Sequence, residues 1–276
     1  MRKWERLSMM FTPRSLLILI AASAFLASGE PRMQEITDKP RSSYGLGSAK
    51  YLEGRNLLYS LFVDTPQSTW SREEMEDTLQ NLNRAAFYIE ETAEEYGQET
   101  ELVCDWQENE KLTGRATVDF EIADDKDFVD RLDQEIGVWV ESMVDYGAMM
   151  EEYDAEGIAL LVFVNNPGTS YAIVYDGMDN PKESVVFFAG EPPAVYAHEI
   201  LHLFGAHDLY QDAEYTKEIT DYLQEAYPSE IMRTVTGQKG EIFEETIVNT
   251  VSPVTAYHLG WIDEIEETDR FPQLKR

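Results

Sequence analysis

The stretch from residue 193 to residue 208 constrains the fold of this chain more than any other. It contains the pattern H-E-x-x-H at residues 198–202, and it holds three of the four histidines in the sequence. On a helix, His198 and His202 lie one turn apart on the same face, so both imidazoles can bind one zinc ion. Glu199 stands beside them, in the position of a general base for water rather than of a ligand. The pattern therefore predicts a zinc-binding helix that the rest of the chain must support.

The helix that carries this pattern is apolar on nearly all sides. Pro193 suits its first turn, and Glu199 is the only acidic residue between Glu191 and Asp208. A helix that is apolar all round is buried, and burying two imidazoles and a carboxylate without partners is costly. A bound metal ion removes that cost, whereas two ordinary histidines on a surface helix would need no apolar surroundings. We therefore expect the histidines to bind a metal.

The residues after this helix supply a candidate third ligand. Gly205 can end the helix in a left-handed turn, which sends the chain back toward the metal. Asp208 follows three residues later, and three protein ligands would leave a fourth position for water. His207 directly precedes Asp208, and imidazole is the more usual zinc ligand. His207 is therefore the alternative third ligand.

The extended pattern H-E-x-x-H-x-x-G-x-x-D resembles the signature of the metzincin metalloproteases. The resemblance implies zinc ligands at His198, His202 and Asp208, with Glu199 as the general base. Aspartate as third ligand is similar to snapalysin and to the immune-inhibitor-A-like secreted bacterial proteases. The later segment 252–261, which contains Leu-Gly-Trp, also resembles the second of these groups.

Metzincins also carry a methionine turn beneath the ligating histidines, and residues 227–233 (Tyr-Pro-Ser-Glu-Ile-Met-Arg) are similar to it. Met232 would then be an apolar floor for the imidazole pair, and an ordinary core methionine is the alternative. Many metzincins place a tyrosine two residues after this methionine, where the present chain has Thr234. Tyr210 and Tyr227 are the candidates to take its role.

A thermolysin-type site is the competing kind of zinc site. It would need a glutamate ligand on a later helix, within a short N-E-x-x-x-D pattern. The helix expected at residues 215–226 contains Glu218 and Glu225, but that pattern is absent. We therefore favour the metzincin-like site, and we expect His258, on a short helix that begins at Ser252, to be structural.

Hydrophobic periodicity predicts strands that alternate with helices, which indicates a mixed twisted sheet with helices packed on it. The class is α/β (α+β), and the resemblance implies a zincin-like form of it. Strands are expected at residues 56–63, 101–106, 115–122, 158–164, 171–175 and 184–188. Helices are expected from the capping box Ser71–Glu74 to Gly97, over residues 127–146, and at the histidine stretch.

The order of these segments predicts four parts of the chain. They are a signal peptide at residues 1–29, a linker or short pro-segment at 30–55, an N-terminal catalytic lobe at 56–208 and a smaller, mostly helical or irregular C-terminal lobe at 209–276. The signal begins with basic residues, continues with the apolar run Leu16–Ala27 and ends in small residues. That run is shorter than the roughly 20 residues of a spanning helix. We therefore expect bacterial export and no stable membrane anchor after cleavage.

The cysteine count and the net charge limit the cellular compartment and the classes of binding partner to be expected. Cys104 is the only cysteine, so no internal disulfide can form, which fits a bacterial exported protein. The net charge of −31 argues against nucleic acid and anionic membranes as partners. The acidic loops 124–127 and 176–180 are the candidates for calcium, but they lack EF-hand spacing, so solvated loops are expected.

Together these features predict a secreted zinc-dependent endopeptidase that acts on peptide or protein substrates. Glu199 would activate water for attack on the scissile carbonyl and then protonate the leaving amine. The alternative is a catalytically inactive or specialised zinc-binding exported protein of the same fold. The intact Glu199 argues against that alternative. The sequence leaves the oligomeric state open.

Overall fold

The computed structural model describes residues 52–105, 111–122, 126–174, 183–210 and 215–275. Its centre is a six-stranded sheet in the order β2-β1-β4-β6-β5, in which β3 also pairs with β1. The strands are β1 (Gly54–Asp64), β2 (Thr100–Val103), β3 (Thr113–Thr117), β4 (Gly157–Val164), β5 (Tyr171–Ile173) and β6 (Ser184–Phe188). All pairs are parallel except β5 with β6, which is antiparallel. The mixed sheet with packed helices confirms the predicted fold class.

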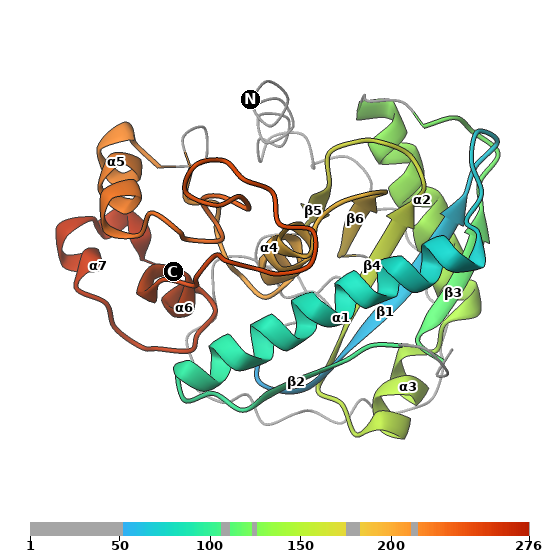
Figure 1. Cartoon of the computed structure of the whole chain (residues 1–276). Helices are drawn as coiled ribbons and strands as arrows, with labels where there is room; N and C mark the ends of the chain where they lie inside the picture. Colours follow the sequence, from blue (N-terminus) through green and yellow to red (C-terminus); the bar gives the residue numbers. More distant parts are fainter. Residues whose placement is uncertain (1–51, 106–110, 123–125, 175–182, 211–214, 276) are drawn as a thin grey trace, which may run out of the picture.

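Helices cover both faces of this sheet (Figure 1). Helices α1 (Arg72–Glu95) and α4 (Pro193–Leu203) pack on one face, and α2 (Lys126–Met143) and α3 (Tyr146–Tyr153) pack on the other. Helices α5 (Lys217–Ala226), α6 (Pro253–His258) and α7 (Glu267–Arg270) and a 3-10 turn at Pro272–Leu274 follow in the C-terminal part of the chain. Every residue of β4 is buried, and successive side chains enter opposite cores. A strand covered on both faces needs this continuous apolar sequence.

Helix α1 begins and ends where its sequence indicates. Ser71 accepts a hydrogen bond from the Glu74 N–H, and the Glu74 carboxylate accepts one from the Ser71 N–H. This capping box satisfies backbone donors that the first helical turn leaves free. Gly97 follows the helix with a φ of +74°, a conformation that glycine adopts without strain.

Several predicted elements end earlier in the structure. The strands predicted at 101–106 and 171–175 stop at Val103 and Ile173. The helix predicted over residues 127–146 ends at Met143, and Asp145 caps a separate helix α3 by accepting from the Ala148 N–H. The strand predicted at 115–122 stops at Thr117, because its partner strand β1 ends opposite it at Asp64. The signal segment 1–29 and both acidic loops lie outside the residues whose side chains are described, while β1 begins inside the predicted linker.

The C-terminal part of the chain packs against α1 and α4 and encloses α4 between itself and the sheet (Figure 1). Buried residues of α5 and α6 belong to the same apolar cluster as those of α1 and α4. The hydroxyl of Tyr96, directly after α1, donates to the Val251 carbonyl, and the Trp261 indole donates to the Leu52 carbonyl. This arrangement buries the helix that carries the histidines.

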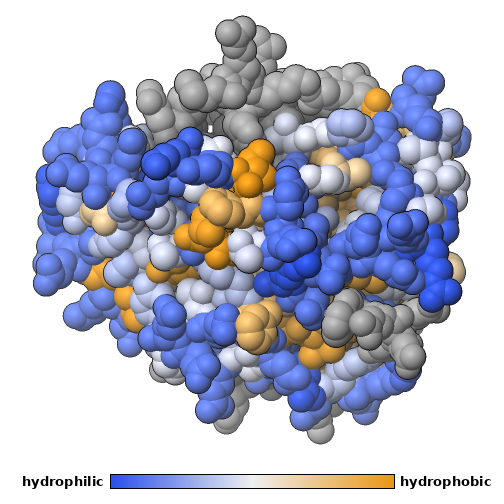
Figure 2. Space-filling model, viewed as in Figure 1, coloured by the Kyte–Doolittle hydropathy of each residue, from blue (hydrophilic) through white to orange (hydrophobic). Residues whose placement is uncertain are grey.

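The surface agrees with the acidic composition. Figure 2 shows that hydrophilic side chains cover most of the face seen in Figure 1, with apolar side chains exposed in small groups. None of the helices in the described ranges is both long enough and apolar enough to cross a membrane.

Candidate metal centre

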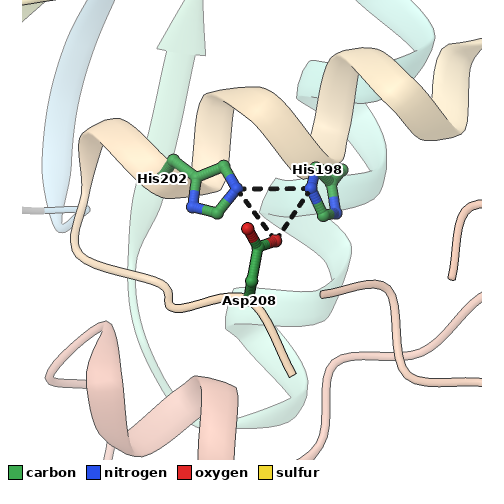
Figure 3. Close-up of side chains that lie close together, drawn as sticks. All are labelled: His198, His202 and Asp208. Atoms are coloured by element: carbon green, nitrogen blue, oxygen red, sulfur yellow. Dashed lines mark hydrogen bonds and ion pairs between the residues drawn. The ribbon is translucent and has the colours of Figure 1, made fainter. Parts of the chain in front are cut away.

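Three side-chain atoms converge at the C-terminal half of α4 (Figure 3). The Nε2 atoms of His198 and His202 lie 3.2 Å apart, and Asp208 Oδ1 lies 3.4 Å from the first and 3.3 Å from the second. The histidines project from one side of the helix, and Asp208 reaches them from the chain beyond it. These three residues form the one cluster of potential metal ligands within the described ranges.

The triangle of donor atoms has the size that zinc requires. With bonds of about 2.0–2.1 Å, two ligands of a tetrahedral zinc ion lie about 3.3 Å apart. The three observed separations match the edges of one face of such a tetrahedron. Asp208 Oδ1 is also buried without a well-formed hydrogen bond within the described structure, which is costly for a carboxylate that has no cation. The residues present therefore fit a zinc ion with an open fourth position.

Backbone carbonyls fix the orientation of both imidazoles. His198 Nδ1 lies 3.0 Å from the Ile231 oxygen, and His202 Nδ1 lies 2.8 Å from the Ala206 oxygen. A carbonyl can only accept, so each Nδ1 carries a hydrogen, and each Nε2 is the nitrogen that can bind a metal at the centre. This is the orientation that a metal ligand needs.

The end of α4 explains how Asp208 reaches the histidines. Gly205 has a φ of +104°, and the N–H groups of Gly205 and Ala206 donate to the carbonyls of His202 and Leu201. This is the Schellman arrangement, in which a left-handed residue reverses the chain after a helix. The Tyr210 hydroxyl then donates to Asp208 Oδ2 at 2.7 Å, which leaves Oδ1 directed at the imidazoles.

The carboxylate and the imidazoles of this cluster stabilise each other's charged forms. Burial raises the pKa of Asp208, but the neighbouring imidazoles lower it far more, and its pKa ends well below the ordinary value. Burial lowers the pKa of His202, whereas the charge of Asp208 and a hydrogen bond to it raise the pKa to about 9. The carboxylate is therefore ionised, and a proton is the competitor that a metal ion must displace.

Glu199 lies between the histidine pair and the edge of the sheet. It is 5% exposed, and its Oε1 is 4.0 Å from His198 Nε2. Burial raises the pKa of its carboxyl, while the two histidines and the backbone amide of Ala172 lower it. Ala172 belongs to β5, the edge strand, so Glu199 stands next to one edge of the sheet.

The structure directs His207 away from the triangle. Its ring lies 4.4 Å from that of His258, and its Nδ1 is 3.2 Å from the Tyr215 hydroxyl. His258 is 1% exposed and its Nε2 lies 3.1 Å from the Leu274 oxygen, as the expected structural role requires. The described cluster of potential ligands contains Asp208 and not His207. A thermolysin-type site would use a glutamate such as Glu218 or Glu225 as a ligand. Both are exposed and lie outside this cluster.

The turn at Met232 is hydrogen-bonded both to the chain after Asp208 and to His198. Met232 is fully buried, and its carbonyl accepts from the Leu209 N–H, directly after Asp208. The preceding residue, Ile231, accepts from His198. The two tyrosines considered for support of the transition state have different hydrogen-bond partners. Tyr210 contacts Asp208, whereas Tyr227 donates to Glu267.

Several groups at the site could not be identified from the sequence. The carbonyls of Ile231 and Ala206 orient the imidazoles, but backbone groups leave no trace in residue identity. Tyr210 was considered for a different role. Glu230 is almost fully buried beside Met232, and its one signal in the sequence is an acidic residue next to the apolar pair Ile231-Met232.

Comparisons with known proteins add little at the level of sequence. No family model matches the chain, and no curated protein matches it. Among solved structures, it is similar to metalloproteinase-II from Bacteroides fragilis at 13% identity and a TM-score of 0.39. The alignment covers 76% of this chain and 53% of that structure, so the chain spans about half the length of its neighbour. The function is therefore argued from the geometry of the site.

Proposed function

We propose that this protein is a zinc-dependent endopeptidase with His198, His202 and Asp208 as metal ligands. The observation that carries the proposal is the triangle of donor atoms with edges of 3.2, 3.3 and 3.4 Å beside the buried carboxylate of Glu199. A purely structural zinc site is closed by four protein ligands. Here three donors and an adjacent base suit a site that holds water.

Each residue has a chemical task in this proposal. When bound, zinc supplies a Lewis acid that lowers the pKa of water and polarises a peptide carbonyl. Glu199 accepts the proton of the attacking water, and it later donates that proton to the leaving amine. Its buried position supports this exchange, because burial raises the pKa of its carboxyl toward the range in which it can both accept and donate.

The substrate in this proposal is an extended peptide that binds along β5. This strand is the edge of the sheet, and the amide of Ala172 within it interacts with Glu199. An exposed strand edge can pair with a peptide backbone, which would bring a scissile bond close to the base. We also propose export through the segment 1–29. The N-terminal sequence of protein recovered from the culture medium tests this, and a mature chain that begins near residue 30 is expected.

The central experiment compares wild type with Glu199→Gln. The variant should bind one zinc ion per chain as wild type does, and it should lose casein cleavage by at least about a thousandfold, because the base is gone while the ligands remain. Glu218→Gln, which removes an exposed carboxylate on α5, is the matched control and should keep both properties. Peptidase activity that survives in purified Glu199→Gln would overturn the mechanism.

A zinc-binding protein without catalysis is the second candidate, and the same measurements identify it. Stoichiometric zinc in the wild type, without cleavage of casein, gelatin or a peptide library, would favour it. A wild-type protein that binds no zinc would overturn both candidates.

A further inference from the structure

Glu230 is a buried carboxylate that the proposed chemistry does not use. Its side chain is 1% exposed. Its Oε1 accepts from the Met232 N–H at 3.1 Å and from the Thr255 hydroxyl at 2.9 Å, and its Oε2 accepts from the Ser252 N–H. The Ser252 hydroxyl also interacts with it. An acidic side chain with this set of partners joins two distant parts of the chain.

The two joined parts are the Met232 turn and the start of α6. Backbone bonds support the same connection, because the Ile231 N–H donates to the Thr250 carbonyl and the Thr250 N–H donates to the Ser229 carbonyl. The Glu230 carbonyl itself accepts from the N–H groups of Arg233 and Thr234. The Ile231 N–H is therefore held by Thr250. The next peptide unit, formed by the Ile231 C=O and the Met232 N–H, is held at its N–H by Glu230 Oε1.

The carbonyl of this second peptide unit, whose N–H bonds Glu230, is the partner of His198. The His198 Nδ1 lies 3.0 Å from the Ile231 oxygen, and this contact determines which ring nitrogen faces the centre. His202 has an independent partner in Ala206, within its own helix end. A change at Glu230 should consequently act first on His198, and it should reach His202 only through His198.

We propose that Glu230 is a positioning residue for the metal centre. Its carboxylate fixes the Met232 turn so that the Ile231 carbonyl holds His198 with Nε2 directed at the metal. Its importance for zinc binding rests on the proposed function, whereas its effect on His198 stands on the contacts alone. Glu230 touches neither the metal ligands nor the substrate strand in the described structure, so it acts through the backbone.

The chemistry of the contacts explains why a carboxylate is needed here. All the groups that point at Glu230 are N–H or O–H donors, and an ionised carboxylate can accept from all of them. Burial raises the pKa of Glu230, and the hydrogen bonds from Ser252, Met232 and Thr255 oppose this shift. Glutamine has the same shape, but its NH₂ group would face a donor, and one end of the connection would be released.

The first test observes the histidine rings in metal-free protein. The chain has four histidines, so two-bond ¹⁵N–¹H spectra of the imidazoles can be assigned completely. In Glu230→Gln the Nδ1–H signal of His198 should shift and exchange faster with water, because its bond to the Ile231 carbonyl is loosened. The Nδ1–H signal of His202, which bonds Ala206, should change less and serves as the internal comparison. Unaltered His198 signals in a folded Glu230→Gln protein would overturn the inference.

The second test measures zinc affinity and kinetics. Glu230→Gln should weaken zinc binding about 10- to 100-fold, as loss of an outer-shell partner does, and at saturating zinc it should lower kcat with little change in KM. Glu267→Gln is the matched control, because Glu267 is also a buried carboxylate of the C-terminal part and accepts from Tyr227. The control should lose stability without changing zinc affinity or the His198 signals.

Thr255→Val is the alternative test variant if Glu230→Gln does not fold. It removes a single donor from Glu230 at nearly constant volume and should change the same observables in the same direction by a smaller factor. If His198 responds to these variants but wild type binds no zinc, the positioning contact stands and the proposed function fails. If wild type binds zinc and neither variant changes its affinity or the His198 signals, the proposed function stands and the role of Glu230 is wrong.

Discussion

The His202 ring is hydrogen-bonded to the Ala206 carbonyl at the C-terminal end of α4. The His202 Nδ1 lies 2.8 Å from the Ala206 oxygen, while the Ala206 N–H donates to Leu201 one turn back. The same turn thus ends the helix, orients one imidazole and starts the path to Asp208. Its geometry depends on Gly205, whose φ of +104° is unfavourable for any residue with a Cβ.

Gly205→Ala should therefore damage stability and metal binding together. A φ in this region costs a residue with a side chain on the order of 1–3 kcal/mol. To relieve that strain the turn must shift, which moves the Ala206 carbonyl and Asp208. We expect zinc affinity to fall about tenfold or more, as measured by titration against a chelator, with a lower urea midpoint.

Gly190→Ala separates the two effects. Gly190 has a φ of +79°, precedes the same helix, and a Cβ there would meet nothing within 4 Å. It should lose comparable stability and keep wild-type zinc affinity. If both variants keep full zinc affinity, the Gly205 turn does not set the position of the third ligand.

Asp208→Ala and His207→Ala decide which neighbour completes the centre. Asp208 Oδ1 lies within 3.4 Å of both Nε2 atoms, whereas His207 packs against His258. Asp208→Ala should lose zinc at micromolar concentrations, and His207→Ala should retain one zinc per chain with reduced stability. Zinc analysis of the purified proteins measures this. Zinc that survives the loss of Asp208 but not of His207 would reverse the assignment.

Tyr210→Phe tests the support of the third ligand. The lost hydroxyl donates to Asp208 Oδ2 at 2.7 Å, and removing such a partner usually costs about 10- to 100-fold in metal affinity. Tyr227→Phe removes a hydroxyl that bonds Glu267 instead, so it should leave affinity unchanged. Equal affinities in wild type and both variants would show that Tyr210 does not orient the ligand.

Much of the fold follows from local sequence signals. The capping box at Ser71 and the glycine at position 97 define α1, and the unbroken apolar run of β4 predicts a strand buried on both faces. The helix predicted over residues 127–146 was wrong at its end, because Asp145 begins a new helix with its side chain. Periodicity continues through such a break, so the pattern alone could not detect it.

The site was predictable to the extent that it depends on side chains of one helix and its following turn. The spacing of His198, His202 and Asp208 is local, and the structure brings these three together. The Ile231 carbonyl is 33 residues from His198 in the sequence, and the Glu230 carboxylate that holds its turn bonds Thr255, 25 residues further on. Such contacts depend on how the C-terminal part folds back over α4, which no local pattern encodes.

Glu191 should make folding depend on pH near neutrality. Burial raises the pKa of its carboxyl to about 7, the charge of Glu199 adds to the rise, and a hydrogen bond from Ser170 opposes it. In the unfolded chain the same carboxyl titrates near its ordinary value of 4.5. Between these two values the folded protein holds a proton that the unfolded chain has released, so stability falls as the pH rises through this window.

Glu191→Gln removes this dependence and provides the measurement. At 1.36 kcal/mol per pKa unit, the shift corresponds to at most about 3 kcal/mol. Below about pH 4.5 both states of the wild type are protonated, so its stability should be closest to that of the variant there. Urea midpoints at successive pH values should show the variant gaining on the wild type up to about pH 7, with a constant difference above about pH 8. A difference that does not change between pH 5 and pH 8 would mean that Glu191 titrates alike in the folded and unfolded chains.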